Sequence, residues 1–113
     1  MNVQIFGTKK SFDSKKAERY FKERGIKYQF VDKKEKGLSK GEFNSVCQAV
    51  GGYEKLIDPK CKDKNLLALV QYLSEEDKKE KILENQKIIR TPIVRNGKQA
   101  TVGYEPDVWK DWK

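Results

Sequence analysis

The stretch IFGTKKSFDSKKAERYFKERGI, residues 5–26, decides the fold. It starts within an apolar run, and we predict a short buried strand over residues 3–6. Apolar side chains such as Ala17 and Tyr20 then recur at helical spacing until Gly25, which ends the helix. A glycine, two lysines and a serine lie at the junction between the two elements. Such a junction is the layout of a reactive or anion-binding site at a helix start.

The residues that follow extend this pattern into a crossover unit. Residues 28–32 alternate and predict a second strand, so the first thirty residues form a right-handed crossover with two parallel strands. Ser39 and Glu42 have the spacing of a capping box and begin a helical middle. We expect residues 39–85 to hold helices and no strand, as a helical insertion into one domain.

The end of the chain returns to sheet. Two apolar runs, residues 93–94 and 100–102, flank Asn96-Gly97, the strongest short-range hairpin signal. Pro106 marks the first turn of a last short helix. The apolar face of that helix would carry Val108, Trp109 and Trp112. The order β-α-β, helices, β-β-α is that of a thioredoxin-like α/β fold, so we predict one domain over residues 1–113 with a four-stranded mixed sheet.

Charge and composition narrow the function classes. The chain has 25 Lys and Arg against 17 Asp and Glu, a net charge of +8, which suits an anionic substrate, an acidic partner or simply a solvated surface. It has no RNA-binding or zinc-finger motif, so direct nucleic-acid binding is not expected. No apolar run approaches the roughly 20 residues of a membrane helix. With no secretory signal either, we expect a cytoplasmic protein without membrane contact.

The two cysteines and the missing histidine limit the chemistry. Cys47 falls on the apolar face of the helical middle, so we expect it to be buried. Cys61 lies in DPKCKDK, which predicts an exposed loop, and no disulfide between the two is expected. Two cysteines without histidine are too few for a zinc site, so we predict no metal.

Two motifs carry a resemblance to a known family. They are IFGTKKSFDSKKAERYFKERGI at the start and RTPIVRNGKQATVGYEPDVWKDW at residues 90–112, joined by a helical middle of the right length. Over nearly all its length the chain resembles the ArsC/Spx family, the arsenate-reductase-related branch of the thioredoxin superfamily. The resemblance implies that Pro92 is cis and faces the helix start. It also places the family's nucleophilic cysteine at Ser11 and its second cysteine position at Ser14.

The resemblance explains why a cysteine would belong at position 11. Amide groups at a helix start stabilise a thiolate and bind oxyanions, and Lys9 and Lys10 would add positive charge. Arg90 is a further candidate for binding the anion. Gly7, Thr91 and Pro92 would form the surrounding loop. A serine hydroxyl needs an adjacent base, and the chain has no histidine, so we predict a site that binds an anion but runs no cysteine redox cycle.

Several alternatives stay open for these serines. Ser11 is either native to a degenerate member or an introduced replacement of a cysteine, or it is only a helix cap, a role that Asp13 or Ser14 could also fill. The reductases of the family place an arginine directly before the proline, where this chain has Thr91. In a strand the neighbouring Arg90 would point to the other face. Arg95 is expected to face solvent.

Three function classes follow from the resemblance. The first is an enzyme related to arsenate reductases and thiol oxidoreductases, with Ser11 in place of the nucleophile. The second is a Spx-like transcriptional regulator that acts by binding RNA polymerase. The third is a small module that holds an oxyanion or a thiol peptide. No cofactor is expected, although glutathione or a thiol protein would be the partner of a cysteine-containing form, and we expect a monomer.

Overall fold

Eleven helices and strands make up the part of the chain that the computed structural model describes, residues 1–112. They are β1 (Val3–Gly7), α1 (Phe12–Glu23), β2 (Tyr28–Asp32), α2 (Lys40–Val50), η1 (Tyr53–Leu56), α3 (Lys64–Tyr72), α4 (Glu75–Glu84), η2 (Gln86–Ile88), β3 (Ile93–Asn96), β4 (Gln99–Val102) and α5 (Pro106–Trp109). No helix among these residues has the length and apolar composition needed to cross a membrane.

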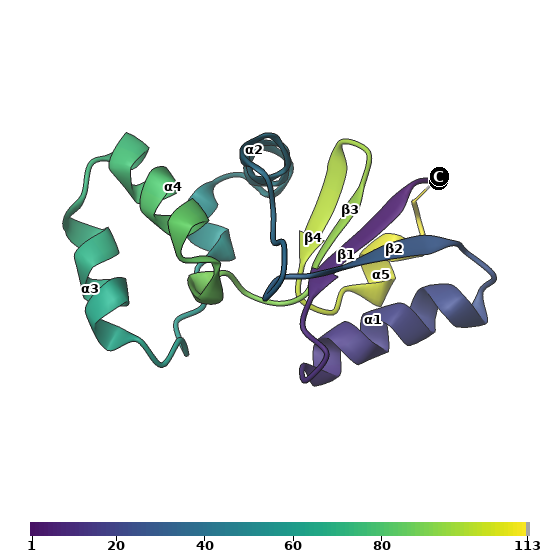
Figure 1. Cartoon of the computed structure of the whole chain (residues 1–113). Helices are drawn as coiled ribbons and strands as arrows, with labels where there is room; N and C mark the ends of the chain where they lie inside the picture. The colour runs from purple at the N-terminus through teal and green to yellow at the C-terminus, as the bar shows by residue number, and fades with distance from the viewer. Residues whose placement is uncertain (113) are drawn as a thin grey trace.

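The four strands form one mixed sheet in the order β2-β1-β3-β4 (Figure 1). β1 and β2 are parallel, with Gly7 opposite Asp32, as the crossover pattern predicts. β3 is antiparallel to both β1 and β4. The predicted element order and the four-stranded mixed sheet are confirmed.

The hairpin between β3 and β4 forms one residue later than its sequence signal. Asn96 is the last residue of β3 and pairs with Gln99, so the two loop residues are Gly97 and Lys98. Gly97 has φ +59°, a conformation that glycine adopts without strain. The Asn96 side chain instead accepts a hydrogen bond from the Asn2 amide (3.1 Å) and donates one to Gln99 (3.2 Å).

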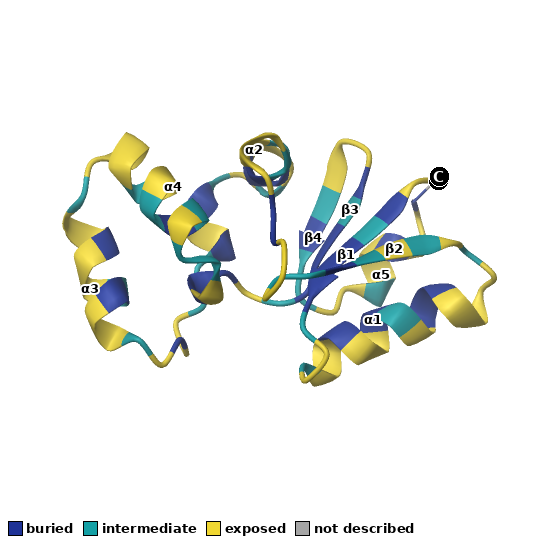
Figure 2. Ribbon diagram, in the orientation of Figure 1, coloured by how far each residue is buried: buried dark blue, intermediate teal, exposed yellow. Residues whose placement is uncertain are grey.

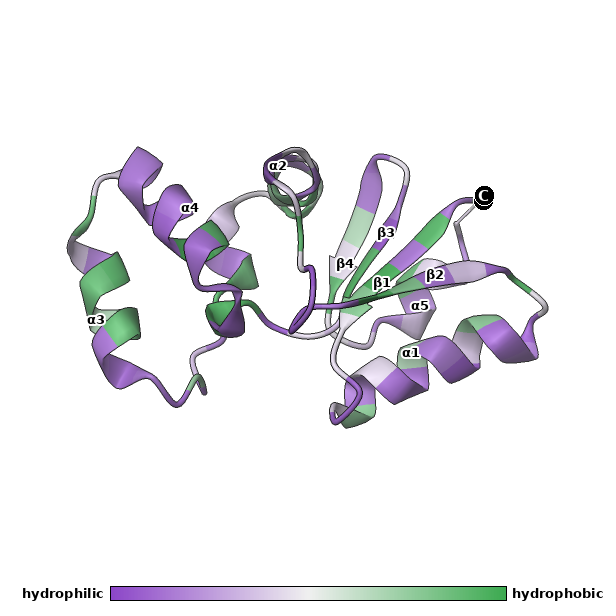
Figure 3. Ribbon diagram, viewed as in Figure 1, coloured by the Kyte–Doolittle hydropathy of each residue, from purple (hydrophilic) through white to green (hydrophobic). Residues whose placement is uncertain are grey.

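Each face of the sheet carries its own apolar core. Buried residues are the dark blue stretches of the ribbon in Figure 2, and hydrophobic ones are green in Figure 3. α1 and α5 cover one face, and α2 packs on the other (Figure 1). The core under α1 and α5 is made of Val3, Ile5, Ala17, Tyr20, Phe21, Val94, Trp109 and Trp112. The other core joins Phe6, Val31 and Ile93 of the sheet to the middle helices.

The last helix meets its predicted role in part. Trp109 and Trp112 are buried, and the Trp109 indole N–H donates to the Thr101 hydroxyl at 2.7 Å. The expectation for Val108 was wrong, because this side chain is 43% exposed. A helix that runs only from Pro106 to Trp109 has a single turn, and its inner side is filled by the tryptophans.

The helical middle forms as predicted, with one addition. Ser39 and Glu42 make the full capping box, with Ser39 N–H donating to Glu42 Oε1 (2.9 Å) and Glu42 N–H to Ser39 Oγ (3.2 Å). Gly51 ends α2 with φ +89°. The pattern did not indicate the single bridge between Ile57 and Ile89, where the chain enters and leaves the helical lobe, residues 53–89.

The two cysteines are both free and both buried. For Cys47 the prediction is confirmed. For Cys61 the expected exposure was wrong, since only 8% of the residue is exposed and it belongs to the core of the helical lobe. Its amide donates to the Asp58 carbonyl at 3.1 Å, so a tight turn directs this loop residue inward.

One side chain clamps the helical lobe to the loop between β2 and α2. Gln86 Oε1 accepts from the Leu38 amide at 2.7 Å, and Gln86 Nε2 donates to the Leu38 carbonyl, also at 2.7 Å. The preceding Gly37 lies against this amide, with φ +71°. Gln86 therefore satisfies both backbone groups of a buried residue across 48 positions of sequence.

Replacing the clamp should destabilise the protein. Gln86→Ala leaves the amide and carbonyl of Leu38 without partners, so we expect a loss of about 1–3 kcal/mol in the free energy of unfolding. Urea unfolding measures it, and Gln71→Ala, at an exposed position of α3, is the matched control with little expected change. Equal midpoints for the two variants would contradict the clamp.

Candidate functional site

Ser11 lies where β1 has ended and α1 begins, and its hydroxyl caps the helix. Ser11 Oγ accepts from the Ser14 amide at 3.2 Å, and the Ser11 amide donates to the Thr8 carbonyl at 3.3 Å. Of the caps that the sequence left open, the structure selects Ser11. The Phe12 and Asp13 amides, in the first turn, have no partner within the helix and point out of its start.

Ser14 has a different role from the cap that the sequence suggested. It is fully buried in the first turn of α1, and its hydroxyl accepts from the Thr8 amide at 3.3 Å. A Cβ at Gly7 would lie 2.9 Å from Ser14 Cβ and closer still to its hydroxyl. Only glycine therefore fits at position 7 with the helix seated so near.

Pro92 closes the other side of this loop. The Thr91–Pro92 peptide bond is cis, as the resemblance implies. β3 pairs Ile93 with Phe6, so the register carries Pro92 to the edge of the sheet where Gly7 ends β1. The predicted loop residues Gly7, Thr91 and Pro92 therefore come together with the start of α1.

The predicted cations are distributed differently. Lys9 and Lys10 are exposed in the turn before Ser11. Arg90 is exposed and lines a separate hollow with Lys55 and Glu105, so the structure does not bring it to the lysine turn.

The expectation for Arg95 was wrong, because this side chain lies partly buried on the sheet. Its Nη1 donates to Gln4 Oε1 at 2.7 Å. The two residues are register partners on neighbouring strands, so Arg95 extends across β1 instead of into solvent.

The sequence reasoning missed Lys33, which follows β2 at this edge of the sheet. Its amide donates to the Gly7 carbonyl at 2.9 Å, and its ammonium donates to the Ile89 carbonyl at 2.7 Å. The side chain is half-buried in a cleft of about 300 Å³. The cleft is lined by Thr8, Lys33, Lys34, Asp58, Gln86, Lys87, Ile89 and Thr91.

Burial gives this lysine an unusual acidity. Loss of solvation lowers the pKa of Lys33 from 10.5 to about 8, while the nearby Asp58 and Cys61 act in the opposite direction. A signal was present in the sequence, since Gln29, Val31 and Lys33 share a face by the two-residue period of a strand. That period continues one residue beyond the strand and points Lys33 toward the helical lobe.

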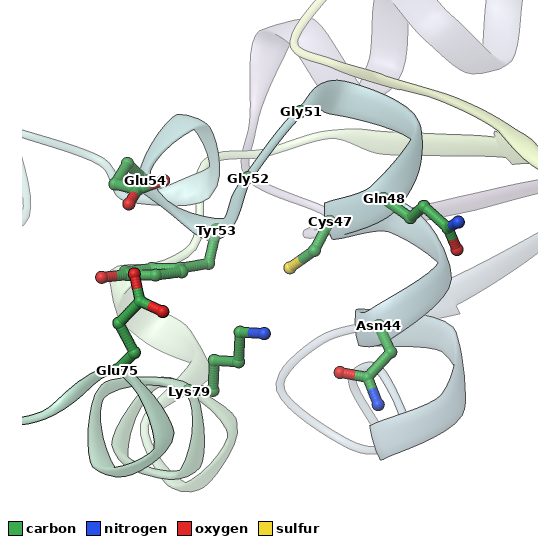
Figure 4. A pocket seen from close by; sticks show the side chains of 9 residues that line it. All are labelled: Asn44, Cys47, Gln48, Gly51, Gly52, Tyr53, Glu54, Glu75 and Lys79. Carbon is green, nitrogen blue, oxygen red and sulfur yellow. The ribbon is translucent and has the colours of Figure 1, made fainter.

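A second hollow, of about 680 Å³, lies between α2, η1 and α4 (Figure 4). The Cys47 sulfur and the Lys79 side chain point into it, and the Tyr53 ring forms one wall. Burial raises the pKa of the Cys47 thiol, Lys79 opposes this and Glu54 adds to it. None of the predicted site residues lines this hollow.

The shifted pKa of Lys33 predicts a pH dependence of stability. Between about 8 and 10.5 the unfolded lysine keeps a proton that the folded one has released, so the stability of the wild type should rise with pH in this window. Relative to Lys33→Met, we expect a gain of about 1–3 kcal/mol across the window. Chemical denaturation of both proteins at several pH values measures it, and parallel stability curves would contradict the shift.

The known proteins that resemble this chain are found among solved structures. A search of curated proteins found no match. An arsenate reductase from Vibrio cholerae is 25% identical with a TM-score of 0.82, and the likeness covers 96% of this chain and 94% of that one. An arsenate reductase (ArsC) related protein from Brucella melitensis is 22% identical with a TM-score of 0.65, over 99% and 94% of the two chains. A protein from Staphylococcus aureus COL is 23% identical with a TM-score of 0.78, over 96% of each chain.

These likenesses confirm the predicted thioredoxin-like α/β fold. The model of the ArsC family matches residues 6–112, and this range contains the helix start at Ser11, the cis bond before Pro92 and the last helix. The chain therefore belongs to the ArsC family.

Proposed function

We propose that this ArsC-family protein uses the start of α1 to bind a ligand and does not use it for thiol–disulfide chemistry. The observation that carries the proposal is the hydrogen bonding of Ser11 and Ser14, the two serines at which the resemblance places the family's cysteines. The Ser11 hydroxyl is held as the cap of α1, and the Ser14 hydroxyl is buried against the Thr8 amide. Both oxygens thus serve the local structure as hydrogen-bond acceptors.

The surroundings supply no means to activate Ser11. A serine attacks only when a neighbouring base removes its proton, and the chain has no histidine. The two residues that precede Ser11 in the turn are lysines, whose ammonium groups accept no proton. Within residues 1–112 the Asp13 carboxylate makes no hydrogen bond to the Ser11 hydroxyl, which accepts from the Ser14 amide. A helix start stabilises a thiolate, whereas a hydroxyl stays protonated there at neutral pH.

The same features support binding of an anion. The Phe12 and Asp13 amides face outward at the positive end of α1, and Lys9 and Lys10 lie in the preceding turn. We propose a small oxyanion, or the thiol or disulfide segment of a protein, as the ligand of this site in the cytoplasm.

Arsenate reduction itself is not our proposal. The solved Vibrio cholerae relative is an arsenate reductase. In this chain, however, Thr91 precedes the cis proline where the family's reductases are expected to carry an arginine, and Arg90 lines another hollow. With no thiol at position 11, the step that would reduce the oxyanion has no electron donor in the site.

Restoring the thiol tests the proposal. In a background of Cys47→Ala and Cys61→Ala, Ser11→Cys should give a thiol with a pKa well below the ordinary value of about 8.5, because the helix start stabilises its thiolate. Alkylation rates across the pH range measure it, and Gln71→Cys, at an exposed position near the end of α3, is the control with an ordinary pKa.

The wild type and Ser11→Cys should also differ in a thiol–disulfide exchange assay. We expect turnover only from the variant. Turnover by the wild type at a comparable rate would overturn the proposal. An ordinary pKa for the Ser11→Cys thiol would show that the helix start does not stabilise a negative charge at position 11.

A second candidate function is a Spx-like regulator that binds RNA polymerase. It is favoured by Phe12, which is 79% exposed directly after Ser11 and lies 5.9 Å from the Lys15 ammonium. An exposed aromatic ring among lysines suits a protein surface that offers an apolar pocket with an acidic rim.

Capture of purified RNA polymerase by the immobilised protein separates this candidate from the first. Phe12→Ser should lose the capture, while Tyr72→Ser, which removes an 86% exposed ring from α3, should keep it. If the wild type captures no polymerase, the second candidate is excluded.

A further inference from the structure

We propose that the cleft beside Pro92 is an oxyanion subsite, in which the Lys33 ammonium and the hydroxyls of Thr8 and Thr91 hold the anionic group of a small ligand. The inference rests on the binding role proposed above, and it moves the main contact from the exposed lysines of the turn to a half-buried lysine on the other side of the loop.

The position of the cleft is the first argument. β1 and β2 are parallel, and both end at this edge, with Thr8 following one strand and Lys33 the other. Ligands of open α/β sheets bind outside the carboxyl ends of parallel strands. Thr91 completes the edge because it precedes the cis proline that leads into β3.

The second argument is which polar groups of the cleft remain available. Gln86 is occupied by Leu38, and Lys87 pairs with Asp63 at 3.0 Å. The Asp58 carboxylate accepts from the Lys60 amide at 2.9 Å. These groups therefore already form hydrogen bonds or an ion pair within the protein.

Lys33 and the two threonines are not committed in this way. Of the three N–H groups of the Lys33 ammonium, one donates to the Ile89 carbonyl. Within residues 1–112 the other two, and the hydroxyls of Thr8 and Thr91, make no hydrogen bond in the structure. Donors from three separate segments thus converge on one space, which matches the several acceptor oxygens of an oxyanion.

The charges around Lys33 set how tightly an anion is held. The Asp58 carboxylate and, outside the cleft lining, the Cys61 thiol lie near it on the segment between η1 and α3. The charge of Asp58 opposes a bound anion, whereas Lys87 of η2 and Lys34 of its own loop favour one. The ammonium is mostly charged at neutral pH and loses its proton near pH 8, far below an exposed lysine. A bound anion favours the charged form, so binding near that pH must draw a proton from solution.

The size of the cleft indicates the class of ligand. About 300 Å³ is at the lower end of the range of small-molecule sites. It suits a small molecule that carries one phosphate, sulfate or carboxylate group.

Titration with inorganic sulfate tests the subsite, because sulfate does not itself titrate near pH 8. Calorimetry at pH 8 in two buffers of different ionisation enthalpy gives the number of protons taken up on binding. For the wild type we expect about 0.5 proton per sulfate, since Lys33 is half-protonated there. Sulfate affinity should also fall as the pH is raised through 8.

Three variants make the result specific to Lys33. Lys33→Met should weaken sulfate binding about tenfold and abolish proton uptake. Lys33→Arg should bind sulfate without proton uptake, because a guanidinium does not titrate in this range. Lys36→Met, at an exposed position of the same turn outside the cleft, should behave as the wild type. Circular dichroism shows whether each variant is folded.

The outcomes separate this inference from the proposed function. Sulfate binding by Lys33→Met with wild-type affinity would place the anion at the start of α1, which overturns the subsite and leaves the proposed function standing. No binding by the wild type up to about 10 mM sulfate, well above a weak millimolar affinity, also overturns the subsite. In that case the pKa of the Ser11→Cys thiol still decides the proposed function by itself.

Discussion

The close approach of Ser14 to Gly7 is the constraint on which the rest of the site depends. The missing side chain at Gly7 lets α1 start directly against the end of β1, and the buried Ser14 hydroxyl then takes the Thr8 amide. The Gly7 carbonyl meanwhile holds the Lys33 amide at the end of β2. One position thus fixes the helix start on one side of the sheet and the cleft on the other.

Local sequence patterns predicted most of the fold because short motifs mark where many of its helices and strands begin and end. The strand of residues 28–32 was placed correctly by alternation, and the capping box of Ser39 and Glu42 marked the start of α2. The cis bond before Pro92 followed from topology and resemblance together. In each of these cases the deciding interaction joins residues close in sequence or belongs to the strand order itself.

The incorrect predictions concern residues whose burial depends on contacts between segments that are far apart in the sequence. Cys61 is buried because the turn at Asp58 packs onto the core of the helical lobe, which a lysine-rich loop sequence conceals. Arg95 crosses to Gln4, a partner 91 residues away. Lys33 was overlooked among neighbouring lysines, although the strand period singles it out. Composition assigns charged residues to the surface, and the enclosure of Lys33 follows from the packing of the helical lobe against this edge of the sheet.

The two ends of the helical lobe lie side by side. Ile57 bridges to Ile89, and the Arg90 amide donates to the Leu56 carbonyl at 2.7 Å, so the chain enters and leaves the lobe at nearly one point. The helical lobe is therefore a segment whose two ends are fixed next to each other by backbone hydrogen bonds. Insertions or deletions at the far tip, between α3 and α4, can change its length while both anchor points stay in place (Figure 1). Changes in the length of this outer tip can therefore leave the strand ends of the proposed ligand site undisturbed.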